Sequence, residues 1–152
     1  ELRAAGIPVG LGSDSPASGV RDALSNLAAA RREGVLSDLE LLTLASSESA
    51  TVARLPVGGF EPGAPADFVA VRDLEGLLAG DRRGLALVMT AGRPLLGERN
   101  LLAGLGVRTA PCRVAGSERA LAEPLARRAL ALQKAHRAVR AAGFLADVEF
   151  RD

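Results

Sequence analysis

A carboxylate and two hydroxyls follow a short apolar run near the start of the chain, in the stretch PVGLGSDSPAS. Asp14 comes directly after the run, and Ser15 and Ser18 lie in the Gly/Ser/Pro loop that continues from it. In α/β barrels the active-site side chains lie just past the C-terminal ends of the strands, so this position suits a catalytic carboxylate. The alternative is that Asp14 or Ser15 caps the next helix or closes the turn, which is a commoner use of these residue types.

The remaining reactive side chains do not complete a site around Asp14. His136, the single histidine, lies on or beside the apolar stripe of a late helix, where a packed residue is a better interpretation than a metal ligand. Cys112, the single cysteine, has no neighbouring His or Lys to lower its pKa and is expected to be an ordinary, partly buried thiol. One cysteine excludes an intramolecular disulfide and a Cys-rich zinc knuckle.

Composition describes a globular chain without a strongly charged partner. The chain has 152 residues, of which 48% are hydrophobic, enough for one modest domain with its own core. Nineteen Lys and Arg against 18 Asp and Glu give a net charge of +1, so we expect neither nucleic acid nor a membrane surface as a partner. No apolar run is long enough to span a bilayer, and cytoplasmic localisation is expected.

The first third of the sequence predicts one short strand followed by helices. ELRAAG is typical of the end of a helix closed by Gly6, and IPVGL of a short buried strand. DALSNLAAARREG predicts an amphipathic helix that ends at Gly34. Ser37 and Glu40 have the spacing of a capping box and predict the start of a second helix, with a further short helix over SESATVARL.

The pattern changes after Pro56, where Gly and Pro become frequent. A strand is predicted over 68–71, and LALVMTAGRPLLG predicts two strands about a turn at Ala91-Gly92. TAPCRV is typical of a loop. From Ser117 onward a helical pattern returns, with a break or a restart at Pro124.

These segments in this order resemble the metal-dependent amidohydrolase superfamily. VGLGSDSPAS is similar to the end of the eighth barrel strand of that family. SSESATVARLPVGGFEPGAPADFVAV resembles its later run of short helix, Gly, Pro-Gly and Ala-Asp before a strand, and VMTAGRPLLG resembles its closing hairpin. The resemblance covers residues 1 to about 100, and the Ser-rich loop is most similar to the cytosine/adenosine-type deaminases and the triazine chlorohydrolases.

The resemblance implies an α/β fold: the last unit of a (β/α)8 TIM barrel and part of the family's composite β-sandwich domain. Residues 1–55 would hold the last barrel strand and its helices, 56–104 the sandwich portion and 105–152 a C-terminal helical segment. Asp14 would bind a catalytic divalent metal, zinc or iron, and relay the proton of the attacking water. Ser15 and Ser18 would shape the substrate loop. The implied function is hydrolysis of a non-peptide carbon–nitrogen bond, in particular deamination of a small heterocycle.

The chain also departs from the family. The metal-binding histidines of the family come from earlier barrel strands that this chain does not contain, and one carboxylate cannot hold a catalytic zinc. The chain alone is therefore expected to be inactive and metal-free. It is a piece of a longer enzyme, one half of a split enzyme completed by a second chain, or a degenerate remnant. The rival hypothesis is a noncatalytic scaffold that binds a partner or a second copy of itself through its open flank.

Overall fold

The computed structural model describes residues 2–13, 19–56, 59–135 and 148–150. The chain divides into two compact units. The first contains Glu1–Asp67 and Leu74–Asp81, and the second contains Phe68–Asp73 and Arg82–Asp152. After the strand in Phe68–Asp73 the chain returns to the first unit for residues Leu74–Asp81. The helix in this short stretch therefore belongs to the first unit.

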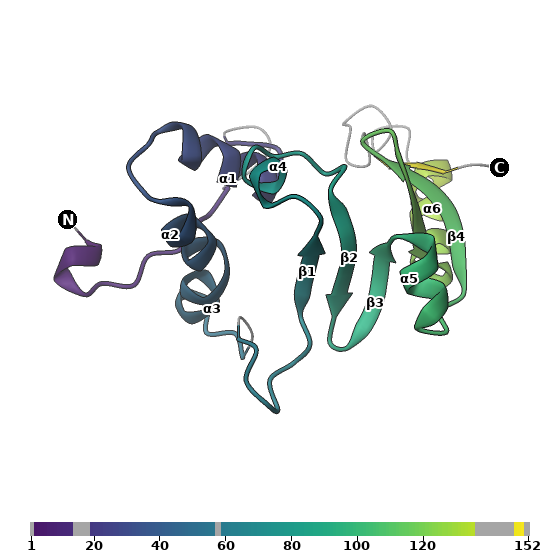
Figure 1. Ribbon diagram of the computed structural model, residues 1–152, viewed down its shortest axis with the longest axis horizontal. Helices are drawn as coiled ribbons and strands as arrows, with labels where there is room; N and C mark the ends of the chain where they lie inside the picture. Colours follow the sequence, from purple (N-terminus) through teal and green to yellow (C-terminus); the bar gives the residue numbers. More distant parts are fainter. Residues whose placement is uncertain (1, 14–18, 57–58, 136–147, 151–152) are drawn as a thin grey trace. The chain divides into compact units, whose positions relative to one another are not determined.

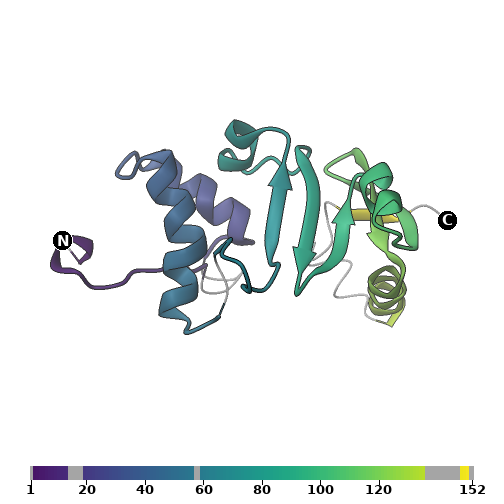
Figure 2. The same cartoon turned by 60° about the horizontal axis from the view of Figure 1, so that its bottom comes forward.

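The first unit is helical in its described part (Figure 1). Its elements are η1 (Arg3–Ala5), α1 (Ala23–Arg32), α2 (Asp38–Thr43), η2 (Leu44–Glu48), α3 (Ser49–Val52) and α4 (Leu74–Leu78). The turn η2 is π-helical and joins α2 to α3, so that Figure 2 shows one continuous helix where the sequence predicted two. Leu27, Leu41 and Leu78 form the buried core of this unit.

The helix boundaries confirm the local signals of the sequence. Gly6 ends η1 with a φ of 72°, a left-handed conformation that glycine adopts without strain. The cap of α1 was not predicted: it is Asp22, and not Asp14 or Ser15, whose side chain accepts a hydrogen bond from the Ser25 amide. Ser37 and Glu40 form the expected capping box at the start of α2.

The strand predicted over Ile7–Leu11 is not formed. Residues 7–13 form no helix and no strand and pair with no strand in the described part of the chain, and Figure 1 draws them as a stretched length of chain that leads from η1. A strand requires a neighbour to pair its backbone groups, and the barrel strands that the prediction presupposed would have to come from elsewhere.

The second unit is built on a six-stranded open sheet. Its strands are β1 (Phe68–Val71), β2 (Leu85–Thr90), β3 (Arg93–Gly97), β4 (Thr109–Val114), β5 (Ser117–Ala122) and β6 (Val148–Phe150). The spatial order is β1-β2-β3-β5-β4-β6, and every neighbouring pair is antiparallel. The strands predicted over 68–71 and on both sides of Ala91-Gly92 are confirmed.

Two expectations for the later chain are wrong. Residues 109–114, read as a loop around Cys112, form β4, and residues 117–122, read as helix, form β5. Ala115 and Gly116 join them in a two-residue turn with positive φ values of 48° and 79°, much like the 48° and 71° of Ala91-Gly92. A hairpin therefore precedes the last helix.

Two helices complete the described part of the second unit (Figure 1). They are α5 (Arg99–Gly104) and α6 (Glu123–Ala135), and α6 restarts the helical pattern at Pro124, near its N-terminus, where the missing amide hydrogen costs nothing. Ala126 of α6 packs into the sheet core beside Leu85, Val114 and Leu121. The mixed α/β class is thus confirmed, while the barrel unit, the sandwich and the three-part domain division stay predictions.

Gly97 marks the closest approach of backbones in this sheet. It lies on β3 between Leu87 of β2 and Ala120 of β5. A Cβ at this position would lie 2.5 Å from the Ala86 carbonyl oxygen, which accepts a hydrogen bond from the Glu98 amide. Any side chain there would push two paired strands apart.

We expect Gly97→Ala to lower the free energy of unfolding by about 1–3 kcal/mol, the usual cost of overpacking. Gly104→Ala is the matched control, because a Cβ at this helical glycine meets nothing within 4 Å. The control should be neutral or stabilising by up to about 1 kcal/mol. Urea unfolding measures both, and equal stability of the two variants would contradict the close approach.

Arg31 joins three helices of the first unit. Its guanidinium donates to both carboxylate oxygens of Asp38, at 2.9 and 2.9 Å, and to both of Glu75, at 2.7 and 2.8 Å. The hydrogen bonds from Arg31 hold the pKa of the Glu75 carboxyl below its ordinary value. A lowered carboxyl pKa stabilises the fold above the ordinary pKa, and this contribution is lost as the pH falls through the lowered value.

We therefore expect the urea midpoint of the wild type to fall more between neutral pH and about pH 3 than that of Glu75→Gln, which has no carboxyl to protonate. Glu61→Gln, at an exposed position of the same unit, should retain the wild-type pH dependence. If the urea midpoint of Glu75→Gln fell with pH as much as that of the wild type, this ion pair would not contribute to the loss of stability in acid.

Candidate functional site

The residues predicted to do chemistry fall outside the described part of the chain. Asp14, Ser15 and Ser18 belong to this group. His136, which was interpreted as a packed residue rather than a metal ligand, also lies outside the described residues. The roles predicted for Asp14, Ser15 and Ser18 therefore stay predictions. The structure does describe the residues that come just before Asp14 in the sequence. Cys112 is described and is only 3% exposed; burial raises the pKa of its thiol, as expected for an unreactive cysteine.

The extended segment before Asp14 is attached to two helices. The Leu11 amide donates to the Ser49 hydroxyl oxygen at 2.9 Å, at the start of α3. One residue later, the Asn26 side-chain amide of α1 donates to the Gly12 carbonyl oxygen at 2.8 Å. Two consecutive residues, Leu11 and Gly12, are thus fixed through their backbone groups, two residues before Asp14 in the sequence.

Close packing strengthens the first attachment. Gly10 lies so near α3 that a Cβ on it would be 3.1 Å from the Ser49 hydroxyl oxygen and 3.2 Å from the Ser49 Cα. The Leu11 side chain packs against the buried core of the first unit. The glycine therefore allows the backbone to approach the helix, and the leucine keeps it there.

The π-helical turn η2 explains why Ser49 is able to do this. Ser49 donates its hydroxyl hydrogen to the Leu44 carbonyl oxygen, five residues earlier, at 2.6 Å. In a π-turn the hydrogen bonds reach five residues along the chain instead of four, and such turns are frequent at functional positions of helices. With its hydrogen directed at Leu44, the Ser49 oxygen is left to accept the Leu11 amide.

The beginning of the segment is held by charge. Arg3 of η1 donates to Glu48 at 2.8 Å and to Glu40 at 3.3 Å, both on the continuous helix. The pKa of Glu40 is lowered chiefly by hydrogen bonds from Ser37, with Arg3 a smaller cause, so its carboxylate stays ionised at neutral pH. All three groups are partly exposed to solvent, and the ion pairs orient the segment more than they stabilise it.

The described residues do not make a metal site by themselves. Within the described ranges, no group of three or more His, Cys, Asp and Glu side chains could hold a metal ion. A catalytic zinc needs about three protein ligands and one open position. In the same part of the chain, no helix is long and apolar enough to cross a membrane.

Comparisons with known proteins leave the chain without an assigned family. No family model matches it, and neither the curated proteins nor the solved structures contain a significant match.

The sequence analysis missed Ser49 and Asn26, the two residues that fix the segment. Asn26 lies in the first turns of α1, where a short polar side chain can reach back over the preceding chain. Ser49 stands in a run of serines, SSES, whose hydroxyls can bond backward along a helix. Nothing local indicates which serine contacts a segment 38 residues earlier.

Ser49→Ala removes the acceptor of the Leu11 amide, so we expect this amide to exchange hydrogen about fivefold faster, the equivalent of about 1 kcal/mol for one hydrogen bond. Ser46→Ala is the matched control, because the Ser46 hydroxyl bonds only within the helix, to the Leu42 carbonyl oxygen. Hydrogen exchange followed by NMR measures both variants. An unchanged Leu11 rate in Ser49→Ala would contradict the proposed attachment.

Proposed function

We propose that this chain is the C-terminal portion of a metal-dependent hydrolase of non-peptide carbon–nitrogen bonds, and that it deaminates a small heterocycle. The observation that supports this most is the attached extended segment. The backbone is fixed at Leu11 and Gly12, two residues before Asp14, and the capped helix α1 follows later in the sequence. This order of parts is what the family resemblance implies for the end of a barrel strand.

The barrel belongs to the same proposal. Ile7–Leu11 would be its last strand, and the sheet of the second unit would be part of the composite β-sandwich. Support comes from the exposure of the segment: Ile7 is 49% exposed, and residues 7–11 pair with no described strand, while the Ile7 amide itself donates to the Leu2 carbonyl oxygen at 3.1 Å. Extended backbone of this kind can pair with a neighbouring strand.

The remaining ligands would come from the rest of the barrel or from a second chain, because the described residues cannot hold zinc or iron alone. When bound, a divalent metal supplies a water whose pKa is lowered towards about 7. The Asp14 carboxylate would accept a proton from this water as its oxygen bonds to the ring carbon. Asp14 would then return the proton to the amino nitrogen as the carbon–nitrogen bond breaks, releasing ammonia. Ser15 and Ser18 would hydrogen-bond the polar edge of the substrate.

A second candidate function is a noncatalytic scaffold that binds a partner. The first unit exposes several large apolar side chains: Leu2 (58%), Ile7 (49%), Val35 (81%), Leu39 (73%), Val52 (49%) and Leu55 (56%). Exposed apolar side chains mark an interface where they gather into one contiguous patch. The remainder of an enzyme or a separate partner protein would cover these side chains equally well. A measurement of catalytic activity therefore distinguishes the two functions.

The test measures ammonia release from cytosine, adenine and an aminotriazine by the native protein with all its chains. We expect turnover of at least one of these amines and a loss of about 10²–10⁴-fold in kcat/KM for Asp14→Asn, which keeps the shape but cannot accept the proton. Glu61→Gln, which removes an exposed carboxylate of the same unit, should retain full activity.

Unchanged turnover in Asp14→Asn would remove Asp14 from the mechanism. Absence of turnover with every amine, together with capture of a defined partner that Leu39→Asp abolishes, would favour the scaffold. Leu39 suits this control because it is 73% exposed and its replacement leaves the core intact.

A further inference from the structure

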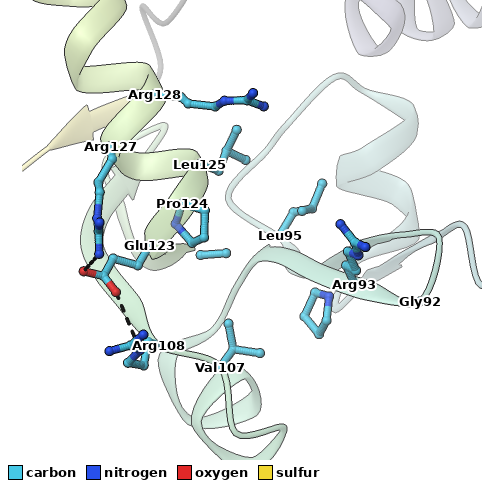
Figure 3. Close-up of a pocket in the computed structure, with 12 residues that line it drawn as sticks. Gly92, Arg93, Leu95, Val107, Arg108, Glu123, Pro124, Leu125, Arg127 and Arg128 are labelled. Atoms are coloured by element: carbon cyan, nitrogen blue, oxygen red, sulfur yellow. Dashed lines mark hydrogen bonds and ion pairs between the residues drawn. The ribbon is translucent and has the colours of Figure 1, made fainter.

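A hollow of about 650 Å³ opens in the second unit between the start of β3, the residues before β4 and the first turns of α6 (Figure 3). This volume lies within the range of sites for small organic molecules. Most of the surface inside it is apolar, and its lining includes Leu95, Val107, Pro124 and Leu125. An apolar hollow of this size favours a ligand with a hydrocarbon body.

Two arginines at the hollow are already paired. Arg127 donates to Glu123 at 2.7 Å, and Arg108 lies 3.8 Å from the other oxygen of the same carboxylate. The hydrogen bond from Arg127 is the main cause that lowers the pKa of Glu123, so the carboxylate is charged at neutral pH. These three residues form a closed group on one side, as the dashed lines of Figure 3 show.

The hollow is also lined by two arginines whose side chains are unpaired within the described ranges. The side chains of Arg93 in β3 and Arg128 in α6 make no hydrogen bond or ion pair with any residue in the described ranges. Figure 3 shows them on opposite sides of Leu95 and Leu125. The hollow thus combines an apolar floor with two guanidinium groups whose donors are available to a ligand.

We propose that this hollow binds a small amphipathic carboxylate. The hydrocarbon body would lie on Leu95 and Leu125, and the carboxylate would accept hydrogen bonds from Arg93 or Arg128. A planar guanidinium matches a carboxylate through two parallel hydrogen bonds. Four arginines against one glutamate leave a charge of +3 around the hollow, which attracts an anion and repels a cation of the same shape. The inference uses no residue of the proposed catalytic site and does not depend on it.

The test is isothermal titration of the protein with octanoate, which has an apolar body and a carboxylate head. Octylammonium has the same tail with a positive head, and acetate has the same head without a tail. We expect octanoate to bind at one site with a dissociation constant on the order of 1 mM. Octylammonium and acetate should give no saturable binding at about ten times that concentration.

Charge reversal then locates the site. Arg128→Glu should weaken octanoate binding by at least about fivefold, because it replaces a donor to the carboxylate by a like charge, and it should favour octylammonium. Arg99→Glu is the matched control: Arg99 is an exposed arginine of α5 that does not line the hollow. It carries the same change in net charge and should leave octanoate binding as in the wild type.

Leu125→Asp provides an independent variant, since Leu125 is 37% exposed and tolerates a polar replacement without loss of the core. It should also abolish octanoate binding, with an unchanged unfolding temperature as the check on the fold. Failure of octanoate to bind, equal binding of octanoate and octylammonium, or equal weakening by Arg99→Glu and Arg128→Glu would each overturn the proposal.

Discussion

The hydrogen bond from the Leu11 amide to the Ser49 hydroxyl is the constraint on which the account of the first unit depends. The segment before Asp14 has no paired strand in the described chain, so its course is set by the helices it touches. Ser49 provides an acceptor because η2 widens the helix and directs its hydrogen to Leu44. Without this bond, Asn26 and the Leu11 side chain would be the main remaining attachments near the loop.

Signals confined to a few residues predicted the structure well. Gly6, the Ser37–Glu40 box and the Ala91-Gly92 turn are each decided by contacts within four residues, and all are where the sequence indicates. The β4–β5 hairpin was missed although Ala115-Gly116 repeats the Ala-Gly turn. Pro111 and the charged residues of the two strands are unfavourable in strands, so the sequence did not predict them. The two strands are stabilised by their pairing with each other, which the structure shows.

The candidate site was predictable only in part for a related reason. A carboxylate after an apolar run is a local pattern, and it predicted Asp14, Ser15 and Ser18 as site residues. Their roles stay predictions. The contacts that direct the chain toward them join residues 14 and 38 positions apart, and no spacing rule relates such positions. In the second unit the arginine-lined hollow likewise gathers residues from β3, from the chain before β4 and from α6. Its charge is invisible in a net balance of +1, because acidic residues elsewhere in the chain cancel it.

The central claim is that this chain supplies one corner of a metal site whose other ligands lie beyond its described residues. The most direct measurement is the intact mass of every chain in the native protein, together with its content of zinc and iron by elemental analysis. The account predicts near-stoichiometric metal together with a polypeptide longer than 152 residues or a second chain. A metal-free sample that contains this chain alone, at this length, would contradict it and leave the scaffold as the better description.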